Sequence, residues 1–202
     1  MKKYLWLTVV ILIVALAFAG CNSNQPQNAS ESYKNTESVY STENNKALIV
    51  YYSYSGTTKR VAEHLQAVTG GDLYEVKLSE PYTGSDNDVS DRVFAERRKG
   101  EMPELTGELP NVEAYDVIFI GTPVWNNSLA NPVSGYLEQT DFNNKTVAPF
   151  WTYITNQGST RRDFSKRIIN GNVVDGLPLA SAYSISDDEL DGLLREWVSN
   201  FE

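Results

Sequence analysis

Ala47-Leu48-Ile49-Val50-Tyr51-Tyr52 is a continuous apolar run rich in β-branched and aromatic residues. Runs of this kind are typical of strands that are covered on both faces, as in a parallel sheet. A polar turn follows, and apolar residues then recur at helical spacing until Gly70 and Gly71, where we expect a helix to end. The stretch therefore predicts a buried strand, a loop and a helix in that order.

The same alternation continues toward the end of the chain. Further strands are expected at Asp72 to Leu78, Asp116 to Gly121, Thr146 to Trp151 and Val173 to Leu179. Further helices are expected around Val89 to Lys99, from Pro132, from about Thr160 to Ile169, and from a capping box at Ser186 to Glu189 as far as Phe201. Pro178 removes one ladder donor, which favours an edge position for the last strand. Five strands alternating with helices predict an α/β protein whose parallel sheet has helices on both faces.

The composition limits the classes of function that the chain can have. At 202 residues it is long enough for one ordinary domain with a hydrophobic core. It carries 17 Lys and Arg against 26 Asp and Glu, a formal net charge of -9. This balance argues against a nucleic-acid partner, which needs a basic face. An acidic body suits a basic protein partner, or a solvated surface with no partner.

One cysteine and one histidine leave little scope for metal or nucleophilic chemistry. Cys21 has no second cysteine to pair with, and His64 lies among helix-forming residues, where we expect a surface or half-buried role. No G-x-S-x-G motif and no plausible Ser-His-Asp set is present in the sequence. We therefore expect no metal site and no catalytic residue supplied by the protein itself.

The start of the chain has the composition of an export signal. Two lysines precede an uncharged apolar run from Tyr4 to Ala19, which is shorter than the about 20 residues of a comfortable spanning helix. Phe18-Ala19-Gly20-Cys21 resembles the lipobox of bacterial lipoproteins, with Phe18 where leucine is usual. The resemblance implies cleavage after residue 20, lipidation of Cys21 and a place on the extracytoplasmic face of the bacterial cell membrane. An uncleaved anchor and ordinary secretion with a free thiol are the alternatives.

Residues 22–45 are built mainly of Asn, Ser, Gln, Thr and Glu. Such a segment buries too little apolar surface to offset its ordering entropy. We therefore divide the chain into a signal peptide (1–20), a lipidated cysteine with a flexible tether (21–45) and one folded domain (46–202). Cleavage would remove two lysines and no acidic residue, leaving 15 basic against 26 acidic residues and a net charge of -11.

Three loops follow buried strands at the edge where parallel sheets bind ligands. The first loop, Ser53-Tyr54-Ser55-Gly56-Thr57-Thr58, combines hydroxyl groups and a permissive glycine at the start of a helix. Backbone N–H groups and the helix dipole favour a phosphate there, although helix caps use the same residues. The loop contains no lysine, so it suits a small phosphomonoester better than a nucleoside triphosphate with magnesium.

The run from Lys46 through this first loop resembles the flavodoxins, particularly a short bacterial form. The resemblance covers essentially Lys46 to Phe201 and implies a three-layer flavodoxin-like fold, with a five-stranded parallel sheet in the order 2-1-3-4-5 and FMN as the cofactor. It implies that the first loop binds the FMN phosphate through Ser53, Ser55, Gly56, Thr57 and Thr58.

The second loop, Gly121 to Asn127, places a tryptophan and two amides at the same crevice. Trp125 is the residue to which we assign stacking on the flavin ring, with packing under the loop as the alternative. The other contacts expected from this loop come from Thr122, Pro123, Val124, Asn126 and Asn127. The third loop, Thr152 to Thr160, is rich in amides and hydroxyls but departs from its relatives, which carry more glycine and serine. Its expected ring contacts are Thr152, Tyr153, Ile154, Asn156, Gln157 and Gly158, with a purely structural loop as the alternative.

Three functions fit these features. The first is a monomeric, lipid-anchored FMN protein that transfers electrons outside the cytoplasmic membrane, with a redox protein or a membrane donor or acceptor as its partner. The second is an FMN-dependent NAD(P)H reductase of quinones or nitro compounds, in which Arg161 and Arg162 would meet the phosphates of the nicotinamide cofactor. The third is a binding lipoprotein that keeps the fold without redox chemistry, because fold alone does not fix function.

Overall fold

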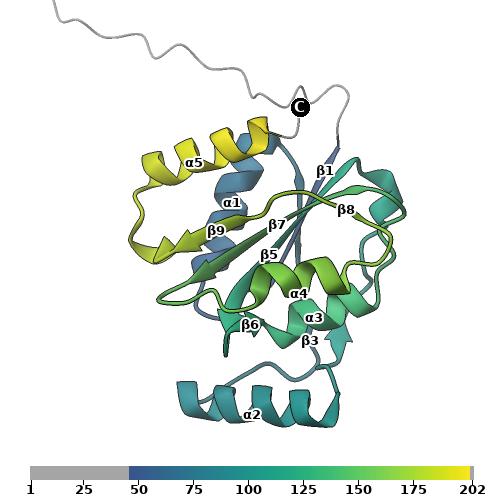
Figure 1. Cartoon of the computed structure of the whole chain (residues 1–202), viewed down its shortest axis with the longest axis vertical. Coiled ribbons are helices and arrows are strands. Elements are labelled where there is room, and N and C mark those ends of the chain that lie inside the picture. The colour runs from purple at the N-terminus through teal and green to yellow at the C-terminus, as the bar shows by residue number, and fades with distance from the viewer. Residues whose placement is uncertain (1–45, 201–202) are drawn as a thin grey trace, which may run out of the picture. The chain divides into compact units, whose positions relative to one another are not determined.

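The computed structural model describes residues 46–200 (Figure 1). The predictions for residues 1–45 and for Phe201 lie outside the described residues. The helices are α1 (Thr57–Thr69), α2 (Asp86–Lys99), α3 (Asn131–Glu138), α4 (Thr160–Arg167) and α5 (Asp187–Ser199). The strands are β1 (Ala47–Tyr51), β2 (Asp72–Glu75), β3 (Lys77–Leu78), β4 (Leu105–Thr106), β5 (Val117–Trp125), β6 (Ser128–Leu129), β7 (Thr146–Tyr153), β8 (Asn172–Val173) and β9 (Leu177–Ala180).

The main sheet has the order β2-β1-β5-β7-β8, and every neighbouring pair on this path is parallel. Strand β9 also pairs in parallel with β7, so β8 and β9 together occupy the place of the fifth strand. In the numbering of the sequence prediction this is the order 2-1-3-4-5. The predicted fold class is therefore confirmed.

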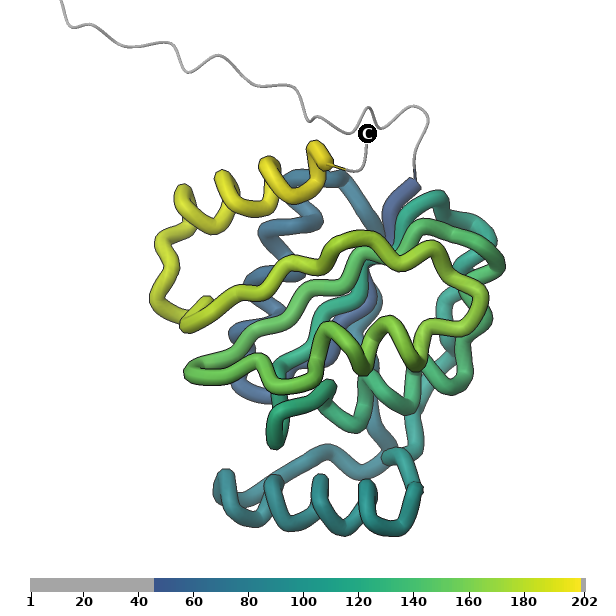
Figure 2. Tube along the Cα trace, in the orientation of Figure 1, coloured from purple at the N-terminus to yellow at the C-terminus, as the bar shows by residue number. Residues whose placement is uncertain are grey.

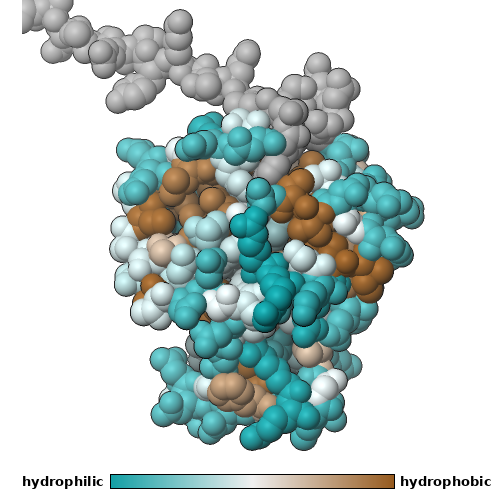
Figure 3. Space-filling model, viewed as in Figure 1, coloured by the Kyte–Doolittle hydropathy of each residue, from teal (hydrophilic) through white to brown (hydrophobic). Residues whose placement is uncertain are grey.

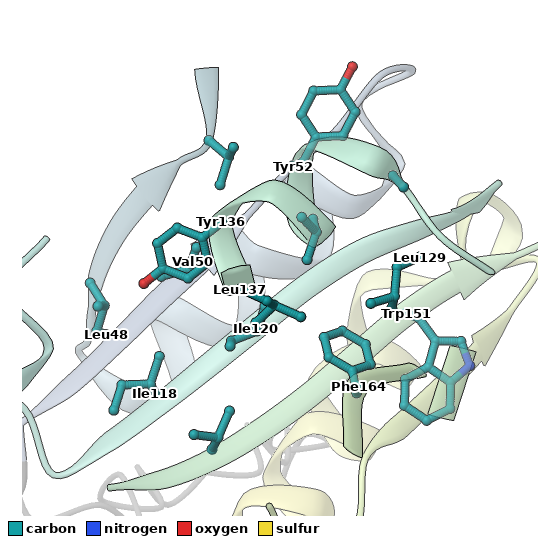
Figure 4. Close-up of a cluster of buried hydrophobic side chains, with 14 of the residues drawn as sticks. Leu48, Val50, Tyr52, Ile118, Ile120, Leu129, Tyr136, Leu137, Trp151 and Phe164 are labelled. Atoms are coloured by element: carbon teal, nitrogen blue, oxygen red, sulfur yellow. The ribbon is translucent and has the colours of Figure 1, made fainter. Parts of the chain in front are cut away.

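Helices cover both faces of the sheet, as Figures 1 and 2 show. On one face Leu65 of α1 and Leu194 of α5 pack in a buried cluster with Phe119 of β5. On the other face Tyr136 of α3 and Phe164 of α4 pack over the opposite side of β1, β5 and β7 (Figure 4). The alternation of side chains along each strand supplies both clusters, which is why β1 is buried along its whole length.

Two predicted strands are each divided in the structure. The run from Asp72 to Leu78 forms β2 and then β3, and β3 leaves the sheet to pair antiparallel with β4. The run from Val173 to Leu179 forms the end of β8 and most of β9, and Pro178 lies in β9 at the sheet edge, as expected. Because both runs lie at edges, neighbouring strands constrain them on one side only.

Helix α2 begins three residues before the predicted stretch and is fixed there by a capping box between Ser85 and Asp88. It buries only Val89 and Val93, as its thin apolar stripe predicts. In the view of Figures 1 and 2 it lies at one end of the domain, beyond α3. Hydrophilic residues cover most of this end of the molecule in Figure 3. None of the helices within residues 46–200 has the length and apolar character needed to traverse a lipid bilayer.

Candidate functional site

The first, second and third loops meet in one cleft at the carboxyl end of the sheet. The cleft has a volume of about 450 Å³, within the range of small-molecule sites. Its lining comprises Tyr54, Ser55, Thr57, Asp86, Pro123, Val124, Trp125, Thr152, Tyr153, Ile154, Ala182 and Tyr183. The parallel order of β1, β5 and β7 brings these loops together, because the three strands end at the same edge.

The first loop presents the open amino end of α1 to the cleft. Gly56, at the N-cap position, has a φ of 92°, which a residue with a Cβ adopts only at a cost. Its N–H donates to Ser53 Oγ at 3.1 Å, while the hydroxyl oxygens of Ser55 and Thr57 lie 3.3 Å apart. No side chain caps α1, and the same is true of α3 and α4, whereas Ser85 caps α2 and Ser186 caps α5. The first-turn N–H groups of α1 are therefore available to an anion.

Thr58 ties the first loop to the third. Its hydroxyl lies 2.9 Å from the hydroxyl of Thr152 across the sheet edge. Both residues are buried, with Thr58 only 1% exposed. Thr58 therefore does not line the cleft itself but holds Thr152, which does.

The second loop is largely a β-hairpin. Strand β5 continues to Trp125, and β6 returns after the two-residue turn Asn126-Asn127. These asparagines have φ of 47° and 61°, the positive values that a type I′ turn requires at both central residues. Asparagine adopts this conformation more readily than most residues because its side chain is short and polar. We call residues 124–129 the Trp125 hairpin.

Trp125 is half-buried and lies at the centre of an aromatic cluster. Its ring is edge-on to Tyr52, Tyr54 and Tyr82, with centroid distances of 5.4, 5.9 and 4.9 Å. It lines the same cleft as Ser55 and Thr57. The tyrosines fix the orientation of the indole, which remains within reach of a ligand bound at the first loop.

The third loop braces the Trp125 hairpin. Ser159 N donates to the carbonyl oxygen of Asn127 at 2.8 Å. The hydroxyl of Ser159 lies 3.1 Å from the same oxygen and 2.5 Å from Asp163 Oδ2. A Cβ added to Gly158 would lie 2.1 Å from that oxygen, so only glycine allows this approach. Trp151 Nε1 donates to Gln157 Oε1 at 3.0 Å, which fixes the outer part of the loop.

Eight of the residues proposed from the sequence line the cleft: Ser55, Thr57, Pro123, Val124, Trp125, Thr152, Tyr153 and Ile154. The remaining residues proposed from the sequence are not part of the lining: Ser53, Gly56, Thr58, Thr122, Asn126, Asn127, Asn156, Gln157 and Gly158. Several of these hold the loops in shape. Thr122 Oγ1 donates to the carbonyl of Pro123 and accepts from Ala130 N, and Asn156 Oδ1 accepts from Gly158 N.

Four lining residues were not among the proposed contacts: Tyr54, Asp86, Ala182 and Tyr183. Tyr54 is part of the first loop, so its place in the sequence between Ser53 and Ser55 could have indicated it. The connection that carries Tyr183 is held by Arg60 of α1, which donates to the carbonyls of Ala182 and Ile185 and pairs with Asp187. Arg60 and these partners are more than 120 residues apart in the sequence, so no local pattern reveals their contact.

Two of the tyrosines beside Trp125, Tyr52 and Tyr82, remain neutral phenols at ordinary pH. Burial raises the pKa of Tyr52 and of Tyr82 well above the usual value for tyrosine. A hydrogen bond to Glu96 raises the pKa of Tyr82 further, because the phenol donates to that carboxylate. Arg92 lies 4.2 Å from the centre of the Tyr82 ring and pairs with Glu96 through Nε at 2.8 Å. The two phenols beside Trp125 are therefore neutral, and Tyr82 is held by the ion pair of Arg92 and Glu96.

His64 has the half-buried position that its sequence context suggests. Its Nδ1 lies 2.7 Å from Asp191 Oδ1, and its Nε2 lies 3.3 Å from Asp187 Oδ1. These contacts join α1 to α5 on the face of the sheet away from α3. His64 is not part of the cleft lining.

A family model of flavodoxins matches residues 46–201. The chain belongs to the flavodoxin family. Among curated proteins none matches the chain significantly.

Solved structures of similar proteins agree with this membership. A flavoprotein from Lactobacillus acidophilus, solved in complex with FMN, is 29% identical, with a TM-score of 0.62 over 74% of this chain and 98% of that one. A protein from Bacteroides eggerthii described as a flavoprotein is 28% identical, with a TM-score of 0.63 over 78% of this chain and 98% of that one. A similarly described protein from Bacteroides uniformis is 28% identical, with a TM-score of 0.62 over 76% of this chain and 97% of that one.

Proposed function

We propose that this protein binds FMN in the cleft and transfers electrons outside the cytoplasmic membrane. The observation that carries the proposal is the shared cleft, in which Trp125 and the open amino end of α1 face one space. The similar flavoprotein from L. acidophilus was solved in complex with FMN, which supports the choice of cofactor.

The first loop fits the phosphate end of FMN. A phosphomonoester needs several hydrogen-bond donors and a positive potential, and the uncapped start of α1 supplies both. The hydroxyls of Ser55 and Thr57 add donors at the cleft wall. Arg60, in the same helix, is committed to Ala182, Ile185 and Asp187, so backbone and hydroxyl groups carry the binding.

Other residues of the lining fit a flat heterocycle. Trp125, Tyr153 and Tyr183 offer aromatic surface in the same cleft, while Pro123, Val124 and Ile154 add apolar surface. Such surface excludes water from a bound ring and favours stacking. FMN, when bound, supplies the electron-accepting and electron-donating chemistry, and the protein orients it.

A spectrum of the full chain, purified in mild detergent and mixed with FMN, tests the cofactor. We expect a protein-bound flavin spectrum that bleaches with dithionite and returns in air. A chain that binds no FMN at micromolar concentration would instead be a non-redox binding protein.

A steady-state assay separates a carrier from a reductase. We expect negligible turnover with NADH or NADPH and a quinone unless a partner reductase is added. The structure offers little support for direct nicotinamide binding by the two arginines considered from the sequence. Arg161 pairs with Asp175, and Arg162 Nε lies 3.9 Å from Asp163. Rapid turnover with either nucleotide alone would assign the protein to the reductases.

The location and the partners follow from the sequence and belong to the same proposal. Lipidation of Cys21 would hold the domain at the outer face of the cell membrane, and the acidic chain suits a basic redox partner or a membrane donor. Labelling cells with a clickable fatty acid tests the anchor. We expect label on the wild-type chain and none on Cys21→Ala, with release of Cys21→Ala from the membrane fraction. Equal labelling of both would contradict lipidation at Cys21.

A further inference from the structure

Helix α2 is attached to the rest of the domain mainly by polar contacts. Its apolar contribution to the core is limited to Val89 and Val93. In contrast, Asn131, at the start of α3 and only 1% exposed, bonds to α2 through both ends of its amide. Its nitrogen donates to Val93 O and Glu96 Oε2, and its oxygen accepts from Arg97 Nε. Hydrogen bonds therefore fix the position of α2 against the start of α3.

Arg97 extends these contacts to the Trp125 hairpin. Its Nη2 donates to the carbonyl oxygens of Trp125 at 3.1 Å and of Leu129 at 2.8 Å. Its Nη1 donates to the carbonyl of Asn126 at 3.4 Å. One guanidinium group thus joins both strands and the turn of the hairpin. No salt bridge to Arg97 is found within residues 46–200, and its guanidinium donates to three backbone oxygens of the hairpin and to the amide oxygen of Asn131.

The geometry points to Arg97 as the residue that positions Trp125 for stacking on the flavin, acting from α2 through the backbone of the hairpin. This inference rests on the proposed binding of FMN. The preceding residue, Glu96, also acts on Trp125. It accepts a hydrogen bond from the hydroxyl of Tyr82, whose ring packs edge-on against the indole at a centroid distance of 4.9 Å. Consecutive residues of α2 therefore hold the backbone of Trp125 and the aromatic wall beside its side chain.

Arginine suits this role better than lysine. Its planar group donates in several fixed directions at once, while an ammonium group on a flexible stem cannot reach all of these oxygens. The group is half-buried against the hairpin, and burial together with the nearby Arg167 lowers the pKa of Arg97 from the usual arginine value. The carbonyl oxygens replace part of the water that the guanidinium loses.

A double-mutant cycle on FMN binding tests whether Arg97 acts through Trp125. We expect Arg97→Gln to raise the Kd for FMN about tenfold in the wild-type background, the effect of losing hydrogen bonds from a charged group. In the Trp125→Ala background the same change should raise Kd less than about twofold, because the residue it positions is gone. Equal effects in the two backgrounds, or no effect in either, would overturn the inference.

Arg98→Gln is the matched control, since it removes the same charge from an exposed position on the same helix. It should leave the Kd within about twofold of wild type. If Arg97→Gln does not fold, Arg97→Lys replaces it in the cycle. Lysine keeps the charge and the aliphatic stem, and we expect an intermediate loss of about fivefold that again disappears without Trp125.

The indole N–H signal of Trp125 in a nitrogen-15 NMR spectrum of the flavin-free protein gives an independent reading. Trp125→Phe identifies the signal, which should shift or broaden in Arg97→Gln and stay in place in Arg98→Gln. If the wild-type chain binds no FMN, the proposed function fails, while this signal still decides whether Arg97 positions Trp125. An unchanged signal in Arg97→Gln would reject the positioning role.

Discussion

The first loop and the Trp125 hairpin line the same cleft, but they are held in place by different kinds of contact. The first loop lies between β1 and α1, and most of its contacts are local: Ser53 accepts from the left-handed Gly56, and Ser55 bonds to Thr57. Its bond from Thr58 to Thr152 is to a residue distant in the sequence. The Trp125 hairpin depends on residues distant in the sequence, namely Arg97 of α2 and Ser159 of the third loop. The groups expected to bind phosphate are thus held mostly by contacts between neighbouring residues, whereas the Trp125 hairpin is held mostly by contacts between distant segments.

The change with the largest expected effect, Gly158→Ala, breaks the support of the hairpin. Its φ of 57° disfavours alanine, and the new Cβ would meet the backbone of Asn127. We expect the free energy of unfolding to fall by about 2 to 4 kcal/mol. The Kd for FMN and the Kd for riboflavin should both rise about 10- to 100-fold, because the displaced hairpin carries the ring contact. Chemical denaturation and flavin titration measure the two effects.

Gly107→Ala is the control for backbone strain alone. Gly107 has a φ of 84°, and an added Cβ would meet nothing within 4 Å. It should cost about 1 kcal/mol of stability and leave flavin affinity unchanged. If Gly107→Ala and Gly158→Ala behaved alike, the close approach to Asn127 would have no special role.

Thr58→Val tests the bond that joins the first and third loops. Valine keeps the shape but leaves the hydroxyl of Thr152 buried without its partner. We expect the free energy of unfolding to fall by about 1 to 2 kcal/mol, with recovery in Thr58→Ser. Equal stabilities for the valine and serine variants would show that the Thr58 hydroxyl contributes nothing.

Gly56→Ala tests how much the first loop contributes to binding of the FMN phosphate. An added Cβ would meet nothing within 4 Å, but a φ of 92° is a strained backbone conformation for alanine. We expect a loss of about 1 kcal/mol in stability and an approximately fivefold rise in the Kd for FMN. Riboflavin, which lacks the phosphate, should bind within about twofold of wild type. A similar loss for both ligands would mean that the first loop also positions the ring.

The smallest expected effect concerns the contact between Arg60 and Asp187, which holds the segment carrying Tyr183. The hydrogen bond from Arg60 lowers the pKa of Asp187 below its usual value. A lowered pKa in the folded state adds stability above the unfolded pKa, and this stability is lost as the pH falls through the folded pKa. Asp187→Asn should therefore lower the thermal midpoint at pH 7 and match wild type once the pH falls below the lowered pKa of Asp187.

Asp188→Asn controls for the loss of a charge at the start of α5, because it removes the same charge one residue further along the exposed first turn. Its effect on the thermal midpoint should be smaller than that of Asp187→Asn. An equal effect would assign the stability to the helix dipole instead of the contact with Arg60.

Much of the fold could be predicted from the sequence because its signals are local. A continuous apolar run such as 47–52 predicts a strand buried on both faces, and the order of strands and helices predicts a parallel sheet. The edges were harder to predict, since Lys77–Leu78 turns away to pair with Leu105–Thr106. Edge segments have one sheet neighbour or none, and their pairing is decided by contacts that the local pattern does not contain.

For the candidate site, the sequence by itself determined the kinds of groups present: hydroxyls, a glycine and a helix start in the first loop, and an indole after the third predicted strand. Only the tertiary structure decided which of these groups share a cleft, and it added Tyr54, Asp86, Ala182 and Tyr183 to its lining. It also decided that Arg97 reaches the hairpin. The reason is physical, since backbone conformation and helix ends follow from neighbouring residues, while contacts between distant segments exist only once the sheet has brought its strands together.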